Sequence, residues 1–125
     1  MTDADAIAIL EETGALLNGH FELRSGLHSD RFFQCANVLR YPRRVAVLCD
    51  ALAAKARDGL GARCDVQTVI SPALGGILVG HEIARALDRP SIFAEKQDGR
   101  LVLRRFEIAP GERCLVAEDV VTRGG

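Results

Sequence analysis

The second half of the chain alternates strand-like and helix-like segments, and this alternation limits the fold more than any other feature. Residues 66–70 are mostly apolar and β-branched, which is typical of a buried strand. Pro72 and the pair Gly75–Gly76 interrupt that run, and apolar residues then recur at helical spacing over 77–87. Residues 91–95 predict another short strand. This order predicts an open, mainly parallel α/β sheet flanked by helices.

The first sixty residues predict helices around a hairpin. Thr2–Asp5 resembles a helix-capping box, and we expect the helix that follows it to run to Asn18–Gly19. Two short segments, 21–23 and 31–38, predict the strands of a hairpin. A helix with one apolar face follows over 42–59.

Two further apolar segments, 101–108 and 113–121, flank a proline- and glycine-containing turn at 109–112. They predict either an antiparallel pair or an approach into the last core strand. The carboxyl ends of parallel strands form the edge where ligands bind in such sheets. Three segments are expected at that edge, and they are 71–76, 95–99 and 118–125.

The composition favours one globular domain and argues against several classes of partner. The chain has 125 residues, of which 48% are hydrophobic and 26% charged, enough for a modest core. Its formal net charge of -1 lacks the basic excess of nucleic-acid and membrane-surface binders. The four cysteines lack metal-ligand spacing, so we interpret them as reduced thiols. Nothing resembles a signal peptide or a membrane span, so we expect a cytoplasmic protein.

The segment 115–125 combines an apolar run with two acids and a polar turn. The carboxylates of Glu118 and Asp119 can only accept hydrogen bonds, which suits the two hydroxyls of a ribose or a divalent metal ion. Residues 122–125 offer a hydroxyl, a guanidinium and unhindered backbone N–H groups, which suit a phosphate. The same pattern also occurs as an ordinary polar turn after a buried strand, and these residues alone leave both interpretations open.

Taken with the rest of the chain, this segment resembles the phosphoribosyl-diphosphate signature of the type I phosphoribosyltransferases. The whole chain is similar to the orotate phosphoribosyltransferase family within that group, with the matching pieces in the expected order. These pieces are residues 21–26, Ser29, Phe32–Phe33, 71–77, 93–96, Arg105–Phe106 and 110–112. The resemblance implies a type I phosphoribosyltransferase-like fold over residues 1–125, with an orotate-side segment over 1–40 and a phosphoribosyl-diphosphate-binding core over 62–125.

The resemblance also implies a reaction. Orotate and phosphoribosyl diphosphate, with Mg²⁺, would give orotidine 5′-monophosphate and pyrophosphate, a step of pyrimidine biosynthesis catalysed by a pentosyltransferase. No protein ligand of the metal is assigned. Members of the family are homodimers, which implies that Lys96 acts in the active site of a partner subunit.

The resemblance assigns catalytic roles to Lys96, which would neutralise the leaving pyrophosphate, and to Asp119. Lys96 alone would be interpreted as a solvated lysine at a strand end. Arg123 stands where the family usually has a smaller residue, and it either adds a phosphate contact or obstructs the site. The expected substrate-binding residues are Arg24, Phe32, Phe33, Lys96, Glu118, Asp119, Val120, Val121, Thr122, Arg123, Gly124 and Gly125.

The family continues beyond the position of Gly125 with a further helix and core strand. The resemblance therefore implies a chain truncated at its C-terminal side, with the last core helix and strand missing. Two alternatives to an active enzyme follow. One is an inactive fragment, and the other is a non-catalytic module that binds phosphoribosyl diphosphate.

Overall fold

The computed structural model describes residues 1–61, 65–122 and 124, which form two compact units. The first unit spans Met1–Val45 and the second spans Ala46–Gly125. The boundary falls within helix α3 (Pro42–Leu60), whereas the sequence suggested segments over 1–40 and 62–125. Helix α3 therefore contributes its first residues to one unit and the remainder to the other.

The first unit begins with helix α1 (Asp3–Glu12), which the predicted capping box initiates. Asp5 N–H donates to Thr2 Oγ1 at 3.2 Å, and Thr2 N–H donates to the Asp5 carboxylate at 2.9 Å. The helix ends earlier than predicted because Gly14 takes a φ of 77°, which a helix cannot continue. Residues up to Asn18, expected in the helix, thus become free to form a strand.

That strand is β1 (Leu16–Glu22), and it pairs antiparallel with β2 (His28–Phe33). The sequence predicted this second strand over 31–38, but the strand ends at Phe33. The short helix α2 (Ala36–Leu39) follows it. The register of the hairpin shifts between Asn18 and Phe21, because β1 carries one residue more than β2 there. The unit is thus a bulged hairpin accompanied by short helices.

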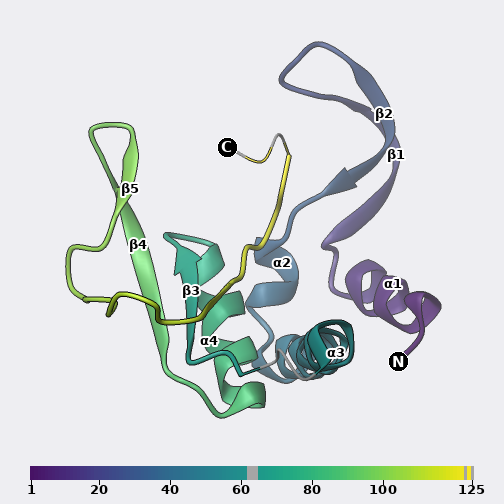
Figure 1. Ribbon diagram of the computed structural model, residues 1–125. Helices are drawn as coiled ribbons and strands as arrows, with labels where there is room; N and C mark the ends of the chain where they lie inside the picture. Colours follow the sequence, from purple (N-terminus) through teal and green to yellow (C-terminus); the bar gives the residue numbers. More distant parts are fainter. Residues whose placement is uncertain (62–64, 123, 125) are drawn as a thin grey trace. The chain divides into compact units, whose positions relative to one another are not determined.

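The second unit contains a four-stranded sheet in the order β5-β4-β3-β6. Strand β3 (Thr68–Pro72) lies between β4 (Ser91–Gln97) and β6 (Cys114–Val116), and both pairings are parallel. Strand β5 (Arg100–Val102) is antiparallel to β4. The predicted α/β class with a mainly parallel sheet is therefore confirmed. Figure 1 shows β4 and β5 extending together as a twisted ribbon.

Helix α4 (Gly76–Leu87) connects β3 to β4 and packs against both strands, as Figure 1 shows for β3. Gly80 and Ala84 are buried in the second unit, and a Cβ at Gly80 would overlap the side chain of Ser71. Glycine is therefore required for the helix to approach β3 this closely. Val69, fully buried in β3, lies at the centre of this core.

Residues 101–108 do not pair with 113–121 but lead into the core strand β6, which agrees with the second of the two sequence-based alternatives. Only the start of this segment is a strand, and it pairs with β4 rather than with residues 113–121. Asp98 and Gly99 have φ angles of 52° and 77°, so they form a two-residue turn that folds the chain straight back on β4. Within the described residues, no helix is both long and apolar enough to cross a membrane.

Candidate functional site

The carboxyl ends of β3, β4 and β6 lie at one edge of the sheet, because the three strands are parallel. Pairing with β3 extends one residue beyond β6, since Ala117 N–H donates to the Ile70 carbonyl at 2.9 Å. Glu118 and Asp119 then follow as the chain bends. The acidic pair is therefore positioned by its attachment to the central strand of the sheet.

The two carboxylates contact the loop that follows β3. A Cβ added to Gly75 would come within 3.0 Å of Asp119 Cγ, and one added to Gly76 within 2.9 Å of Glu118 Oε1. Real Cβ atoms do not approach other atoms so closely, so any larger residue would displace the acids. The sequence indicated a break between a strand and a helix at these glycines. It missed that they make room for the carboxylates.

Consecutive residues of a regular strand point to opposite faces, so Glu118 and Asp119 can serve one ligand only where the strand bends. In the structure they do diverge, since Glu118 lines a cavity while Asp119 packs against Gly75. They remain close because the backbone bends, and Asp119 N–H donates to Glu118 Oε1 at 2.9 Å. Both acids thus lie beside two consecutive glycines of a single loop.

The pKa of Glu118 is raised above its ordinary value. Partial burial is the largest cause, and the hydrogen bond and negative charge of neighbouring Asp119 act in the same direction. The donated backbone N–H of Asp119 opposes this effect. A cation or hydrogen-bond donor placed between the two carboxylates would relieve their repulsion, so the pair is suited to bind a ligand with such groups.

A cavity of about 650 Å³ opens beside Glu118, a size suited to a small organic ligand. One wall is apolar and is formed by the sheet and by the chain following β5. Its apolar lining residues are Ile70, Pro72, Ala94, Leu101, Leu103 and Val116. Ser71 is also among the lining residues, but its hydroxyl is buried on the side of Gly80 in helix α4 and has no hydrogen-bond partner among the described residues.

Much of the predicted substrate-binding segment 118–125 lines this same cavity. Val120, Val121, Thr122 and Gly124 all do so, together with Glu118. Arg123 and Gly125 lie outside the described residues. The structure therefore brings together the acids and the polar turn that the sequence placed at this edge.

Lys96 lies on a strand rather than on a loop. It is exposed near the end of β4, where its cross-strand partner is Leu101. Side chains alternate along a strand, so Lys96 is on the same face as Ala94, and both Ala94 and Leu101 line the cavity. Lys96 makes no ion pair with any residue the structure describes. Its ammonium is thus available to an anion.

The base of this hairpin is held from the opposite face. Arg105 donates two hydrogen bonds to the Glu95 carboxylate, at 3.0 and 3.3 Å. These bonds lower the pKa of Glu95, and the Arg105 charge adds to that effect. Next to them the rings of Phe93 and Phe106 meet edge to face, with centroids 5.2 Å apart. These contacts tie the chain beyond β5 back to the strand that carries Lys96.

The predicted orotate-side residues belong to the first unit, whereas the acidic pair and Lys96 belong to the second. Arg24 is exposed in the connection between β1 and β2, which the Gly26 N–H closes by donating to the Leu23 carbonyl at 2.8 Å. Phe32 packs on Phe21 with ring centroids 5.6 Å apart. Phe33 ends β2 and is 39% exposed, so at least one aromatic face is accessible on this hairpin.

Metal-ligating side chains do not form a dedicated cage. Among the described residues, no group of three or more histidines, cysteines or acids could hold a metal ion. The pair Glu118–Asp119 offers neighbouring carboxylate oxygens at the sheet edge. A metal bound there would need most of its ligands from water or from a bound substrate.

Comparisons with known proteins agree on one relationship. The chain is 48% identical over 126 residues to the orotate phosphoribosyltransferase of Chlorobaculum parvum, with 100% of this chain and 63% of the relative covered. It is 52% identical over 127 residues to the enzyme of that name from Pelotomaculum thermopropionicum, covering 100% and 64%. The chain thus spans just under two thirds of the length of these relatives. No family model matches it.

Solved structures show the same relationship at the level of the fold. Orotate phosphoribosyltransferase from Francisella tularensis matches with a TM-score of 0.59 and 27% identity, covering 77% of this chain and 48% of that one. Leishmania donovani UMP synthase matches with a TM-score of 0.70 over 97% of this chain and 26% of its own, and at 16% identity it supports the fold alone. The chain has a type I phosphoribosyltransferase fold, and by sequence it is similar throughout its length to orotate phosphoribosyltransferases.

Proposed function

We propose that this chain carries the phosphoribosyl-diphosphate site and the orotate-side hairpin of an orotate phosphoribosyltransferase. The reaction would transfer phosphoribose from phosphoribosyl diphosphate to orotate, giving orotidine 5′-monophosphate and pyrophosphate for pyrimidine biosynthesis. The observation that supports this best is the acidic pair seated on Gly75–Gly76 beside the cavity, in a chain about half identical to such enzymes.

In the proposed mechanism, Glu118 and Asp119 accept hydrogen bonds from the two ribose hydroxyls. As the bond to pyrophosphate breaks, positive charge develops at C1 of the ribose, and fixed carboxylates nearby stabilise it. The close neighbours Gly75 and Gly76 hold the acids in place before the substrate arrives. The chain would thus supply a preorganised negative field at the reacting sugar.

The 5′-phosphate is proposed to bind at residues 122–125, through the Thr122 hydroxyl and backbone N–H groups. Lys96 is proposed to neutralise the pyrophosphate as it leaves. Arg24 would contact substrate phosphates, and Phe32 or Phe33 would stack on the flat orotate ring. The support for Arg24 and the phenylalanines is their exposure on the hairpin and the resemblance of that segment to the family.

Magnesium fits this site as an ion that arrives with its substrate. Mg²⁺ usually keeps several waters and takes one or two carboxylates together with substrate phosphates, and Glu118 and Asp119 supply that number. When bound, the ion would neutralise charge on the diphosphate. The proposal further includes a homodimer in the cytoplasm, with Lys96 serving the partner subunit, on the strength of the family resemblance.

The primary test follows orotate absorbance after phosphoribosyl diphosphate and Mg²⁺ are added. Asp119→Asn is expected to lower turnover by about 100-fold or more, because it removes charge stabilisation at the reacting centre. Arg104→Ala is the control, since this exposed arginine has no role in the proposed site. Equal effects of the two substitutions would refute the assignment of the acidic pair.

A second test concerns the glycines beneath the acids. Gly75→Ala would push the Asp119 carboxylate from its position, so we expect phosphoribosyl diphosphate to bind about tenfold more weakly or worse. Gly59→Ala is the matched control, because its Cβ would meet nothing within 4 Å and it lies in helix α3. Titration calorimetry measures both, and unchanged binding by Gly75→Ala would contradict the proposed geometry.

Binding without turnover is a second candidate function. The observation in its favour is exposed apolar surface at the site: Val116 in the edge strand β6 is 74% exposed and lines the cavity. A chimera extended with the part of the Chlorobaculum parvum enzyme left uncovered separates the candidates. Turnover of orotate by both proteins supports the enzyme. The binding module is supported if only the chimera turns over orotate while phosphoribosyl diphosphate still raises the melting temperature of the 125-residue chain.

A further inference from the structure

Two histidines face each other across the β1–β2 hairpin, and the proposed reaction uses neither. The Nδ1 atom of His28 lies 2.7 Å from the Nε2 atom of His20. The ring centroids are 4.8 Å apart and the ring planes are inclined by 40°. Both residues are exposed, so small molecules and ions in solution can reach them.

The bulge in β1 directs His20 toward His28. Asn18 pairs with Arg31 and Phe21 with Ser29, so Gly19 and His20 together oppose only Asp30. A bulge of this kind redirects a side chain relative to a regular strand. The neighbouring pair, Glu22 with His28, is in register again. The facing nitrogens thus result from the backbone of the hairpin.

A hydrogen bond between two imidazoles needs one ring to donate its N–H and the other to offer a lone pair. Divalent transition metals bind neutral imidazole nitrogens at about 2.0–2.1 Å, so two such nitrogens on one ion lie roughly 3 Å apart. The observed 2.7 Å is only a few tenths of an ångström shorter. Exposed rings can make this adjustment by small side-chain rotations.

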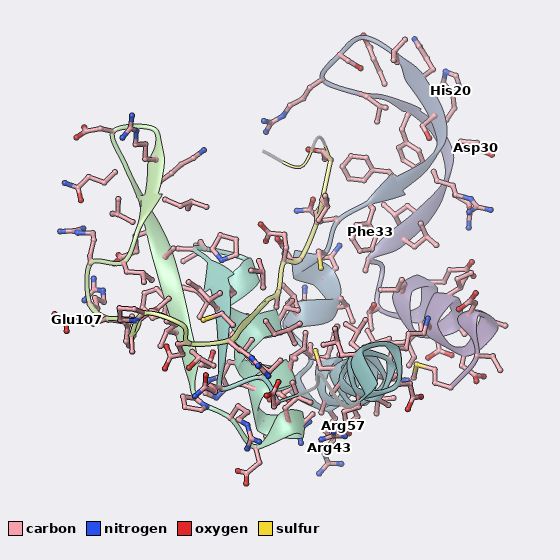
Figure 2. The ribbon with its side chains drawn as sticks, in the orientation of Figure 1. His20, Asp30, Phe33, Arg43, Arg57 and Glu107 are labelled. Atoms are coloured by element: carbon pink, nitrogen blue, oxygen red, sulfur yellow. The ribbon has the colours of Figure 1, made fainter. Side chains whose placement is uncertain are left out.

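The surroundings favour a cation. Glu22 is the cross-strand partner of His28, and Asp30 lies two residues beyond His28 on β2, so both carboxylates lie on the histidine face. Figure 2 shows His20 and Asp30 projecting from the same side of the hairpin. Among the described residues, no third ligand completes a cage, so water would fill the remaining positions.

We propose that His20 and His28 form a two-histidine site for a divalent transition metal ion of the nickel, copper and zinc class. The ion replaces the proton shared between the rings and cross-links β1 to β2. A two-ligand site of this kind exchanges its ion with solution, because water provides the other ligands. The bound ion would stabilise the hairpin that carries Arg24, Phe32 and Phe33.

The test is a calorimetric titration of the 125-residue chain with Ni²⁺, which prefers imidazole and binds thiolates less readily than Zn²⁺. His20→Gln and His28→Gln are each expected to weaken the site by at least about tenfold. His81→Gln is the matched control, since this exposed histidine lies in helix α4 of the other unit, and it should bind as the parent does. Nickel binding that survives both hairpin substitutions, or that His81→Gln abolishes, would overturn the proposal.

A second measurement guards against misfolded variants. All four proteins are expected to share one circular dichroism spectrum, because the substituted side chains are exposed. Paramagnetic Ni²⁺ should broaden the imidazole signals of His20 and His28 together in the parent, while those of His81 stay sharp. Broadening of His81 alone, or of all three rings to the same extent, would show that the hairpin pair is no specific site.

Discussion

The chain's two hairpins are held together in different ways. The β4–β5 hairpin has a two-residue turn, is anchored in a four-stranded sheet, and is tied at its base by Arg105–Glu95 and Phe93–Phe106. The β1–β2 hairpin stands as a separate two-stranded sheet with a longer connection and a bulge. A two-stranded hairpin is only marginally stable by itself, so its side-chain pairs carry more of its order.

This difference bears on the proposed roles of the hairpins. Lys96, the proposed contact for pyrophosphate, lies on a strand that pairs with β3 as far as Ala94 and with β5 beyond it, which limits how far the lysine can move. Phe32 and Phe33 would meet a flat ring from a strand with one neighbour, which leaves them freer to adjust. We therefore expect the β4–β5 hairpin to tolerate backbone changes less well than the β1–β2 hairpin.

Valine substitution in the two turns gives the largest expected effect. Gly99 and Gly26 both have positive φ angles, 77° and 83°, and both have open space around them, so steric contact does not distinguish them. Gly99→Val should cost about 1–3 kcal/mol of unfolding free energy, because a β-branched residue is strained at positive φ and a two-residue turn cannot relax. Gly26→Val should cost less, since its connection is longer.

Urea denaturation measures the two costs, and amide hydrogen exchange at Gln97 and Arg100, the pair that closes the two-residue turn, reports the β4–β5 pairing. Faster exchange at both amides is expected in Gly99→Val and not in Gly26→Val. If Gly26→Val proved more destabilising than Gly99→Val, the connection between β1 and β2 would be the more tightly constrained one. The β1–β2 hairpin would then tolerate backbone changes less well than the β4–β5 hairpin.

Loss of an aromatic pair is the next effect in size. Phe106→Leu removes the edge-to-face contact with half-buried Phe93, and we expect a loss of about 1 kcal/mol. Phe32→Leu removes the contact with Phe21, but Phe32 is 36% exposed, so about half that loss is expected. Thermal unfolding of the two variants gives this ranking. A larger loss for Phe32→Leu would mean that the separate hairpin depends more heavily on its rings.

Local patterns in the sequence predicted the framework of the second unit. Apolar β-branched residues predicted β3, helical spacing predicted α4, and the acids at the end of an apolar run lie at the sheet edge beside a cavity. These features depend on neighbours along the chain, which is why periodicity detects them. The family resemblance then connected segments that no local pattern could connect.

Features that depend on register or on distant contacts were missed. The sequence left open whether residues 101–108 pair with 113–121 or lead into the last core strand, and it did not indicate that the start of this segment pairs with β4. The bulge beside His20 and the fit of Gly75 against Asp119 depend on three-dimensional distances of a few ångström. The presence of two adjacent glycines and two adjacent acids at the same sheet edge is a signal that could have indicated the contact between Gly75 and Asp119.

The smallest expected effect concerns acid sensitivity at the base of the β4–β5 hairpin. Arg105 lowers the pKa of Glu95 from its ordinary 4.5, so the folded chain binds this proton less readily than the unfolded chain does. The contribution of the pair to stability is therefore present above pH 4.5 and is lost as the pH falls through the lowered value. Because Arg105 is exposed and Glu95 is only partly buried, the effect should be small and sensitive to salt.

Arg105→Gln should flatten the decline of melting temperature below pH 4.5, whereas Arg104→Gln should change it less, because Arg104 acts on Glu95 only through its charge. The β1–β2 hairpin has no such carboxylate–arginine pair among the ion pairs found in the described residues, so Arg24→Gln should leave the acid decline unchanged. An equal flattening by Arg24→Gln would mean that net charge, rather than the Glu95–Arg105 contact, sets the acid response. The contrast between a hairpin with an ion pair at its base and one without would then have no measurable consequence.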